Sequence, residues 1–566
     1  MKTAIIPLAL SPNQRGPIIT SSSAPTQDAR MVRCFNTLFP NAIKQDSPLY
    51  CEKIPGWATV VTPGGANSGT AFFVPPSAGV WLSAFGSSTS SIFMTSTNIG
   101  TSNGVVTRFN AGSLGGIEYI FFNDSANTGW YFPLGAPNIL TTAYTADGNN
   151  STTITDIKIA GVNNTAGLFP GQLLAAASNI VAGSRVVSVN AGAFTAVLDT
   201  ATTGGAFNDL AITKTRIAKI ADADFVNYGH FGGFEEMDGY VFAAVTNFAT
   251  ISPGVGNSDL NNAYSWSAAN FVPCHIYDNP SGIAKYRDHI VFFGLNTVQF
   301  FYNAGNASGS ILSQNDNLTI FGIGCVGGSG SGISLITTVG DTIYWLGVTG
   351  GVISGIYRLN GFTPEKISND AVTRHLAAVI PALIYNVFPA FDGFSMFGQD
   401  FLYVGLGDIG YLYCVQSNTW VEAGFFSGGM RIAGDTNSVA DPTLYGVRMT
   451  GATGKIYEMS ETALTYQDDT AAYSMVIQGE KNNLGTGGWK QIQSFELIAD
   501  TQASGTTLLE ITNDDYVTWQ TIGTFDMTAQ RKIIDCGGGY YGEIAFRLTH
   551  SANTAWRGQG LIVEHT

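Results

Sequence analysis

The sequence predicts an all-β protein with a β-propeller-like body, a small β-sandwich inserted into that body, and a C-terminal β-domain. The first observation behind this prediction is the composition. Of the 566 residues, 45% are hydrophobic, only 12% are charged, and 68 are glycines. A chain of this length can bury a sizeable core. Its abundant glycine and scarce charge are typical of turn-rich β-structure rather than of helices or disorder.

The second observation is a repeated phrase that begins at an aspartate. Its clearest copy, DHIVFFGLNTVQFFYNAG, holds two apolar segments rich in Val, Ile and Phe with a short turn between them. This pattern predicts a β-hairpin. Copies of the phrase begin at five positions, namely Asp238, Asp288, Asp341, Asp400 and Asp441.

The third observation is the spacing of these copies. Successive aspartates are 50, 53, 59 and 41 residues apart, close to the period of about 40 to 50 residues that propeller blades show. Segments 80–96 and 117–134 have the same strand–turn–strand rhythm, so we expect about seven units. A closed or nearly closed propeller would bury their faces without long free sheet edges. We place this β-propeller body at residues 61–145 and 215–470.

The repeated aspartates indicate architecture rather than catalysis. An Asp at the turn that enters a strand can accept backbone N–H bonds and fix the turn. A residue that recurs in every repeat is expected to stabilise the structure of the repeat. We therefore assign these carboxylates to turns.

Residues 146–214 interrupt the rhythm of the repeats. They contain few aromatic residues and short alternating segments such as SRVVSVN and FTAVLDT. This pattern predicts a small β-sandwich inserted at an exposed loop tip of a blade. The stretch GLFPGQLLAAASNIVAGSRVVSVNAGAFTAVLDTA is similar to the Ig-like modules that decorate phage structural proteins. The resemblance implies that this insertion is an Ig-like β-module.

The two ends of the chain predict separate elements. Residues 1–60 are expected to form an N-terminal arm and the first strands, because the opening MKTAIIPLALSP lacks a convincing signal-peptide cleavage site. Residues 471–566 predict a C-terminal β-domain. Within it, TNDDYVTW (512–519) resembles the Asp-box hairpin, with Tyr516 at the position of the usual glycine. In sialidases this box is a turn motif remote from the chemistry, so the resemblance implies a structural role.

One helix is expected in the chain. The segment NDAVTRHLAAVI (369–380) has apolar residues at helical spacing. Asn369 or Asp370 is the expected N-cap, because either side chain can accept a bond from a free N–H of the first turn. We interpret this helix as a packing element with one exposed side.

The charge balance restricts the partners of the chain. It has 26 basic and 41 acidic residues, a formal charge of −15, and no basic run. Tight, direct binding of DNA is therefore disfavoured. Passage of DNA is compatible with this charge, because a wall along which a polyanion slides needs only weak contacts. The chain has no run of about 18 apolar residues, so we expect no membrane span.

The cysteines are scattered and predict free thiols in a reducing compartment. No C-x-x-C pair occurs, and the wide spacing differs from that of a zinc knuckle or a small disulfide scaffold. The six positions are Cys34, Cys51, Cys274, Cys325, Cys414 and Cys536.

Enzyme candidates can be named, but no pattern unites them. A sialidase-like glycosidase needs an acid, a nucleophile and arginines that converge on a carboxylate. The residues of suitable type are Arg287, Arg358, Glu365 and Arg374, together with Glu235, Glu236 and Asp238 in the phrase FEEMD. Nothing in their spacing indicates convergence, so we expect no enzyme and no catalytic residue.

Metal and cofactor signals are weak as well. The segment SQNDNLT (313–319) lacks the alternating acids and closing Glu of an EF-hand. The glycine-rich segment 325–334 lacks the Lys-Ser/Thr ending of a P-loop. No pair of histidines has metal-ligand spacing among His230, His275, His289, His375, His550 and His565. We therefore expect neither a cofactor nor a metal site.

The middle of the chain carries a family resemblance. The runs YSWSAANF (264–271), GIAKYRDHIVFFGLNTVQFFYNAG (282–305), FGIGCVGGSG (321–330) and DTIYWLGVTGGVISGIYRLNGFTPEKISNDAVTRHL (341–376) resemble the podovirus tail nozzle, or tail hub, proteins of the packaged-DNA stabilisation family. At the N-terminus, segment 29–60 is similar to the opening of that family. The match is looser at both ends of the chain.

The resemblance implies a virion structural protein of a short-tailed bacteriophage. It implies a homo-hexamer ring below the portal and the adaptor (head-to-tail connector) proteins, with tail fibres or spikes as further partners. The ring would extend the tail tube, retain packaged DNA and conduct the viral dsDNA during ejection, without sequence-specific binding. Its implied location is the virion tail, after assembly in the host cytoplasm.

Two other classes of protein remain as alternatives. One is a tail fibre or receptor-binding β-protein, which is usually trimeric. The other is a glycan-active propeller, sialidase-like or a depolymerase, which host polysaccharide turnover would reveal. The symmetry of the assembly and an activity assay distinguish the three classes.

Overall fold

A computed structural model describes most of the chain. The described residues are 2–7, 33–35, 37–38, 51–56, 58–63, 69–73, 80–86, 88–106, 108–134, 143–175, 178–247, 252–327, 335–383, 390–396, 398–406, 410–423, 431–435, 446–450, 454–460, 464–468, 471–479, 481–485, 487–514 and 516–566. They are nearly all β-structure, which confirms the predicted fold class. Their contacts divide the chain into unit 1, residues 1–62, 367–437 and 442–566, and unit 2, residues 63–366 and 438–441.

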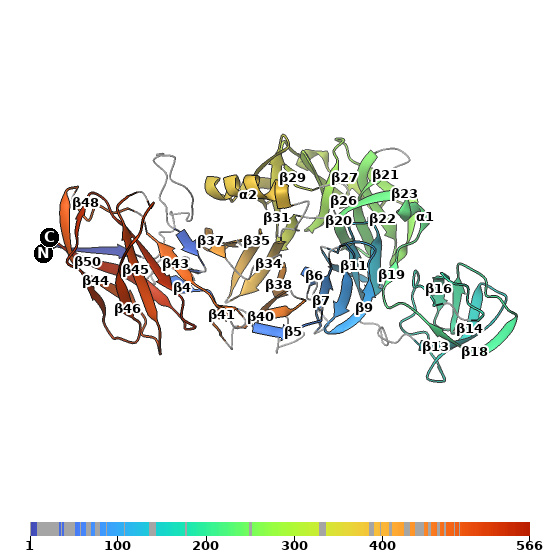
Figure 1. Cartoon of the computed structure of the whole chain (residues 1–566). Helices are drawn as coiled ribbons and strands as arrows, with labels where there is room; N and C mark the ends of the chain where they lie inside the picture. Colours follow the sequence, from blue (N-terminus) through green and yellow to red (C-terminus); the bar gives the residue numbers. More distant parts are fainter. Residues whose placement is uncertain are drawn as a thin grey trace. The chain divides into compact units, whose positions relative to one another are not determined.

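Unit 2 contains five antiparallel sheets that follow one another between Gly69 and Lys366 (Figure 1). Sheet A consists of β6 (Gly69–Phe73), β7 (Leu82–Phe85), β8 (Ser91–Met94) and β9 (Thr97–Thr101). Sheet B consists of β10 (Asn110–Leu114), β11 (Ile117–Asn123), β12 (Gly129–Pro133) and β19 (Ala218–Lys219). Sheet C consists of β20 (Tyr228–Met237), β21 (Tyr240–Asn247), β22 (Ser252–Asp259) and β23 (Asn262–Pro273).

The two remaining sheets of this series hold the clearest repeats. Sheet D consists of β24 (Pro280–Tyr286), β25 (His289–Gly294), β26 (Thr297–Asn303), β27 (Leu312–Gln314) and β28 (Ile320–Phe321). Sheet E consists of β29 (Gly324–Cys325), β30 (Ile336–Val339), β31 (Thr342–Thr349), β32 (Val352–Asn360) and β33 (Thr363–Lys366). Each copy of the repeated phrase in these sheets is a hairpin, as predicted.

Successive sheets of unit 2 pack face to face. Ile290 and Phe292 of β25 belong to a core shared with sheet C, whereas Val291 and Phe293 belong to a core shared with sheet E. Because side chains alternate along a strand, β25 is buried on both faces. This double burial explains why its sequence, HIVFFG, is an almost continuous apolar run.

The inserted segment forms a β-module with its own core in unit 2. Its six strands are β13 (Ala143–Asn149), β14 (Thr153–Ile159), β15 (Val162–Asn163), β16 (Val186–Asn190), β17 (Thr195–Leu198) and β18 (Ala206–Thr213). They form one sheet in the order β16-β17-β14-β13-β18, with β15 on β14. Tyr144, Ile154 and Leu198 are among its buried core residues. The separate β-module was predicted, and its Ig-like character stays a prediction.

The largest sheet of unit 1 has 13 strands, which include two further four-stranded meanders. One meander is β34 (Ala390–Met396), β35 (Gln399–Gly405), β36 (Gly410–Cys414) and β37 (Thr419–Ala423). The other is β38 (Arg431–Asp435), β39 (Gly446–Thr450), β40 (Ile456–Ser460) and the N-terminal strand β5 (Ala58–Val61). The rest of this sheet is β2 (Arg33–Phe35), β43 (Met475–Gln478), β45 (Thr506–Thr512), β46 (Gln520–Asp526) and β49 (Ala545–His550).

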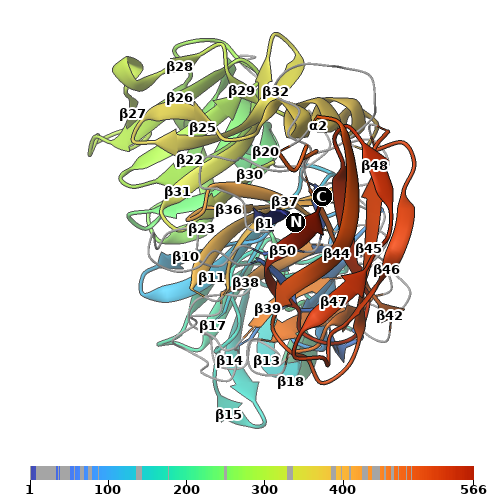
Figure 2. The ribbon, with the colours of Figure 1, turned by 90° about the vertical axis from the view of Figure 1, so that its left-hand side faces the viewer.

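A second sheet of unit 1 joins the two ends of the chain. It contains β1 (Lys2–Pro7), β3 (Thr37–Leu38), β4 (Cys51–Lys53), β44 (Trp489–Ala499), β47 (Lys532–Asp535), β48 (Gly539–Tyr541) and β50 (Arg557–His565). Strand β1 pairs antiparallel with β50 along its whole length (Figure 2). The predicted N-terminal arm therefore completes a sheet of the C-terminal strands. A separate two-stranded pair is β41 (Gln467–Asp468) and β42 (Ala471–Ala472).

The domain boundaries predicted from sequence stay predictions. The sequence groups residues 215–470 into one body, whereas contacts place residues 367–437 in unit 1. The physical reason is a shared core, in which Phe394 and Tyr403 belong to the same buried cluster as Leu509 and Val563.

Helices are few among the described residues. The predicted helix is α2 (Asp370–Leu383), where the backbone N–H of Val372 donates to Asn369 Oδ1 at 2.8 Å. Asn369 is thus the N-cap. Two one-turn elements, α1 (Ala223–Val226) and the 3-10 helix η1 (Asp316–Leu318), were not predicted. No helix among the described residues is long and apolar enough to cross a membrane.

Candidate functional site

Of the four described aspartates that open the repeats, three lie at hairpin turns and Asp400 lies within a strand, paired with Ser395. Asp238 follows β20 in a left-handed backbone conformation, with φ of 55°. Asp288 lies between β24 and β25, Asp341 between β30 and β31, and Asp400 near the start of β35. Asp441 lies outside the described residues. The predicted turn position is therefore correct for Asp238, Asp288 and Asp341, whereas Asp400 is the second residue of β35.

Three of these carboxylates bind side chains, and that of Asp288 binds the neighbouring His289. Asn303 Nδ2 donates to Asp238 Oδ2 at 2.7 Å, which ties sheet D to the first hairpin of sheet C. Gln416 Nε2 donates to Asp400 Oδ2 at 2.9 Å. We expected backbone N–H donors for these carboxylates. The sequence did not single out the two buried aspartates that receive such donors.

Asp124 is the first of these two aspartates. Its side chain is fully buried and accepts five hydrogen bonds from N–H groups of Asn103, Gly104, Ala126, Thr128 and Trp130, at 2.9 to 3.1 Å. Four of the donors are backbone amides and one is the indole Nε1. This carboxylate fixes the segment between β9 and β10 to the turn between β11 and β12.

Asp278 has a similar role at the start of sheet D. It is 3% exposed and lies between β23 and β24. Its Oδ2 accepts the backbone N–H groups of Asn296 and Thr297, both at 2.7 Å, and the Thr297 hydroxyl at 3.0 Å. The carboxylate thereby holds the turn between β25 and β26.

The four main enzyme candidates each have a local partner. Arg358 and Glu365 oppose each other on β32 and β33 and pair at 3.0 Å. The guanidinium of Arg287 lies 5.1 Å from the ring centroid of the preceding tyrosine. Arg374 Nε donates to a carbonyl one turn earlier in α2 at 3.2 Å. Each of these contacts lies within a single hairpin or helix, as is common for charged side chains at a protein surface.

The carboxylates of the FEEMD phrase also have structural partners. Glu235 Oε1 accepts Arg108 Nη2 at 2.9 Å and Asn110 Nδ2 at 3.2 Å. Burial raises the pKa of Glu235, and Arg108 opposes that rise. Arg108 also donates to the carbonyl of Ile283 at 3.3 Å. This network joins sheets B, C and D. Glu236 Oε1 accepts a backbone N–H of the next turn.

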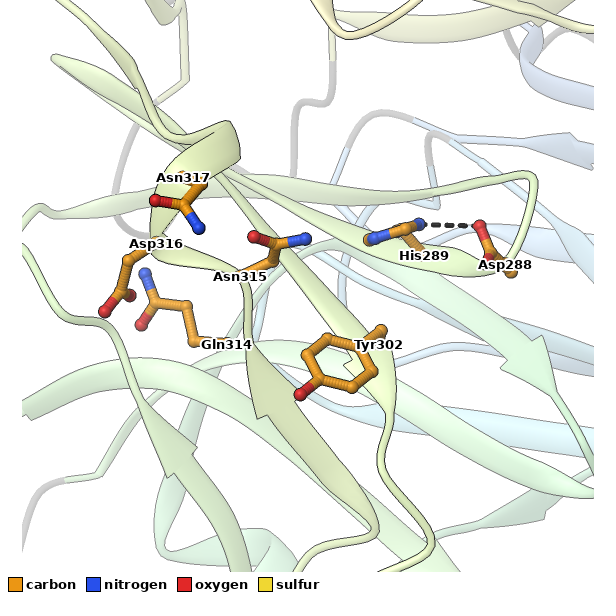
Figure 3. Close-up of a pocket in the computed structure, with 7 residues that line it drawn as sticks. All are labelled: Asp288, His289, Tyr302, Gln314, Asn315, Asp316 and Asn317. Carbon is orange, nitrogen blue, oxygen red and sulfur yellow. Dashed lines mark hydrogen bonds and ion pairs between the residues drawn. The ribbon is translucent and has the colours of Figure 1, made fainter.

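A polar hollow opens beside sheet D (Figure 3). Its volume is about 580 Å³. Its lining comes from the turn before β25, from β25, β26 and β27, and from η1. The segment SQNDNLT (313–319), considered above as a calcium loop, contains η1 and contributes four of the lining residues. The lining residues are Asp288, His289, Tyr302, Gln314, Asn315, Asp316 and Asn317.

The hollow is suited to polar contacts rather than to acid catalysis. His289 Nδ1 lies 2.7 Å from Asp288 Oδ1, and this hydrogen bond lowers the pKa of Asp288. A general acid for glycoside hydrolysis needs a raised pKa instead. The Asp288 side chain is 82% exposed, so water competes for its hydrogen bonds.

Burial lowers the pKa of three histidines. His230 is 2% exposed, and burial lowers its pKa to about 3. Its ring centroid lies 3.8 Å from that of Phe225. Burial also lowers the pKa of His550 to about 4 and lowers that of His565. His375 Nδ1 contacts the hydroxyl of Tyr411. These contacts are those of packed residues.

The described cysteines are free thiols. Cys325 is fully buried, and burial raises its pKa. Residues 328–334 of the glycine-rich segment lie outside the described residues. The free thiols are Cys51, Cys274, Cys325, Cys414 and Cys536.

The sequence did not single out a carboxylate cluster in the module. Oxygens of Asp147, Asp156 and Asp209 lie within 4.8 Å of one another, a geometry that could hold a cation. Lys158 Nζ already bonds Asp156 at 2.6 Å and Asp209 at 2.9 Å. The ammonium group therefore supplies the positive charge that these carboxylates need.

The segment that resembles an Asp-box forms the turn between β45 and β46. Asp514 accepts the hydroxyl of Thr512 at 2.6 Å and the backbone N–H of Thr518 at 2.9 Å. Tyr516, at the glycine position of the motif, has a left-handed φ of 67°. Tyr516 adopts this conformation at a steric cost that glycine would avoid.

This turn makes a testable contribution to acid stability. Hydrogen bonds lower the pKa of Asp514 to about 2, below its ordinary value of 3.8. The stabilisation is therefore present above about pH 4 and is lost as the pH falls toward 2. We expect D514N to weaken the pH dependence of unit 1 stability in this range, measured by urea unfolding. D535N, at an exposed carboxylate of β47, is the control, and an unchanged dependence in D514N would contradict the role of the turn.

The comparisons with known proteins give one family match. Residues 178–424 match the phage stabilisation family described as "Bacteriophage P22 Gp10, beta-propeller". The matched segment begins inside the module and runs through sheets C, D and E to the end of β37. It contains the four runs between residues 264 and 376 on which the sequence resemblance mainly rests, whereas the similar segment 29–60 lies outside the match. No curated protein matches the chain.

Three solved structures illustrate the structural likeness. Sqt1 of Saccharomyces cerevisiae is 9% identical, with a TM-score of 0.33, and the match covers 72% of this chain and 100% of that one. The exo-β-1,3-galactanase of Phanerochaete chrysosporium is 9% identical, with a TM-score of 0.23 and coverages of 81% and 95%. AztD of Citrobacter koseri is 13% identical, with a TM-score of 0.28 and coverages of 73% and 92%. At these TM-scores, none carries an argument about activity.

The family match supports a structural protein of a bacteriophage tail, with a location in the virion. The meander sheets and the family description together confirm the predicted β-propeller. The carboxylates described above mainly hold turns and join neighbouring sheets.

Proposed function

We propose that this chain forms the nozzle ring of a short-tailed bacteriophage, a homo-hexamer that extends the tail tube, retains packaged DNA and conducts it during ejection. The observation that carries the proposal is the family match over residues 178–424. The ring would lie below the portal and bind adaptor proteins, with fibres or spikes attached to it. It would assemble in the host cytoplasm.

The charge of the chain supports passage of DNA without tight binding. With a formal charge of −15, an acidic wall would repel or weakly contact phosphates, so that the polyanion can slide. A ring requires a heterologous interface, in which one patch contacts a different patch on the next subunit. Such an obligate interface would bury on the order of 2,000 Å² or more.

The mass of the purified chain tests the ring. Light scattering is expected to give six times the chain mass of 59.9 kDa, and adaptor protein is expected to co-migrate with that species. A trimer would favour a fibre protein. Turnover of host polysaccharide would contradict our proposal that the chain is not an enzyme and would favour a glycan-active propeller.

The inserted module has a separate proposed role. We propose that residues 146–214 face outward and attach fibres or contact the host surface. A deletion of this segment is expected to keep rings and adaptor binding while fibre attachment is lost. Collapse of the rings would contradict this role.

A packing control is needed for the deletion. Phe169 of the module belongs to the core of sheets A to C and lies 5.4 Å from Tyr131, measured between ring centroids. The variant F169A removes this packing but keeps the module. If F169A also loses fibres, the loss follows from packing rather than from the missing surface.

A further inference from the structure

A second hollow in unit 2 combines residues of the module with residues of sheets A and B. Its volume is about 560 Å³. Strand β9, the start of β12, the segments before β16 and after β18, and β19 contribute to it. Its lining residues are Asn98, Ile99, Gly100, Thr101, Asn103, Trp130, Leu173, Arg185, Lys214, Thr215, Arg216, Ile217 and Lys219.

The residues that line this hollow carry a positive charge, although the whole chain is negatively charged. Four of its residues are basic, namely Arg185, Lys214, Arg216 and Lys219, and none of its described lining residues is acidic. The whole chain has 26 basic and 41 acidic residues. Cations gathered in a hollow without a lining carboxylate repel one another, and an anion between them would relieve that repulsion.

Lys214 is the most constrained of these four cations. It is 5% exposed, and its Nζ has no hydrogen-bond partner among the described residues. The nearest aromatic ring is that of Tyr144, whose centroid lies 5.6 Å from Nζ. Burial, with repulsion from Arg216, lowers the pKa of Lys214 to about 7. A buried ammonium without an acceptor is costly, so a bound anion would stabilise its charged form.

The two arginines are held in place by backbone carbonyls. Arg216 Nη1 donates to the carbonyl of Asn98 at 2.6 Å, and Arg185 Nη1 donates to the carbonyl of Gly171 at 3.1 Å. A guanidinium that is already oriented loses less side-chain entropy when it binds a ligand. Guanidinium groups bind the oxygens of phosphate in a fixed, bidentate geometry.

The remaining lining residues indicate the kind of molecule to which the anionic group is attached. The amides of Asn98 and Asn103 and the hydroxyls of Thr101 and Thr215 offer donors and acceptors, and the Trp130 ring offers an apolar wall. The volume lies within the range of about 300 to 1,000 Å³ for small-molecule sites and exceeds the needs of one inorganic ion. A concave site of this size suits one sugar ring better than duplex DNA.

We propose that this hollow is a phosphate-binding site whose preferred ligand is a phosphorylated saccharide. The cations hold the phosphate, and the amides and hydroxyls contact the sugar. The site does not depend on the ring assignment, because it lies within unit 2 of a single chain. Free phosphate and a sugar phosphate share the anion chemistry, and the measurement must separate them.

The test is isothermal titration of the full-length chain at constant ionic strength. Inorganic phosphate, glucose 6-phosphate and glucose are the probes. We expect glucose 6-phosphate to bind more tightly than inorganic phosphate, and glucose alone not to bind. Binding of neither phosphate compound would overturn the proposal. Equal binding of both would restrict the site to free phosphate and overturn the saccharide assignment.

Variants locate the binding in the hollow. R216Q and K214Q are each expected to weaken glucose 6-phosphate binding by about tenfold or more. K285Q, at an exposed lysine of β24, is the matched control and is expected to leave the affinity unchanged. If K214Q does not fold, R216Q alone decides the location. Unchanged affinity in R216Q, or competition by a short DNA duplex, would overturn the proposed site.

Discussion

Replacing Asp124 by alanine is expected to lower the free energy of unfolding of unit 2 by about 3–5 kcal/mol. The substitution leaves five N–H donors without their acceptor in a buried site, including the indole Nε1 of Trp130. Because the donors come from two neighbouring segments, the contact between sheets A and B should loosen first. Urea unfolding, followed by tryptophan fluorescence and by hydrogen exchange of sheets A and B, measures this effect.

Asp238→Ala is the matched control for that substitution. Asp238 is an exposed aspartate of a repeat, with one hydrogen bond to Asn303 at 2.7 Å. Its loss should cost about 1 kcal/mol or less. Equal effects of D124A and D238A would show that burial of the Asp124 carboxylate does not carry the stability that we assign to it.

Arg108→Ala is expected to have the second-largest effect, a loss of about 3 kcal/mol in the free energy of unfolding. The substitution removes the partner of Glu235, whose side chain is 13% exposed, and leaves a nearly buried carboxylate beside Asn110. It also removes the bond from Arg108 to the carbonyl of Ile283. Urea unfolding of the full-length chain measures the loss.

A double variant separates charge burial from packing. In R108M/E235L both charged groups are replaced by apolar side chains of similar length. Removal of both members of a buried ion pair is often nearly neutral, so we expect stability within about 1–2 kcal/mol of the wild type. A double variant as unstable as R108A would show that the arginine acts through its other bonds rather than through the carboxylate.

The strands of the inner sheets could be predicted because both of their faces pack against apolar side chains of neighbouring sheets. In DHIVFFG, the alternating pairs Ile290 with Phe292 and Val291 with Phe293 pack in opposite directions, so the whole segment must be apolar. The helix at α2 was predictable for a similar local reason, since its N-cap residue and its apolar spacing lie in one short segment. Local patterns therefore gave the class of fold.

The pairing of distant segments could not be predicted. Strand β5 completes a meander with β40, and β1 pairs with β50, although almost the whole chain separates these last two strands. Short apolar segments near the N-terminus fit many sheet edges equally well, so their sequence does not specify a partner. The shared core of residues 390–423 and the C-terminal strands was missed for the same reason.

The roles of the two buried carboxylates also could not be predicted from the sequence. Asp124 and Asp278 stand in turn-like segments, as many exposed aspartates do, and only tertiary contacts distinguish them. Asp278, for example, binds amides of Asn296 and Thr297 in the hairpin that follows. The basic hollow was missed because Arg185 and Arg216 are 31 positions apart in the sequence and form no basic run. Only folding of the module brings their side chains to one hollow.

Negative-stain electron microscopy of the purified chain, alone and with portal and adaptor proteins, tests the nozzle assignment most directly. A nozzle protein is expected to form six-fold rings that dock onto the adaptor and continue its channel. Three-fold particles or monomers that bind glycan and ignore the adaptor would contradict the nozzle assignment and favour a fibre protein or a glycan-active propeller.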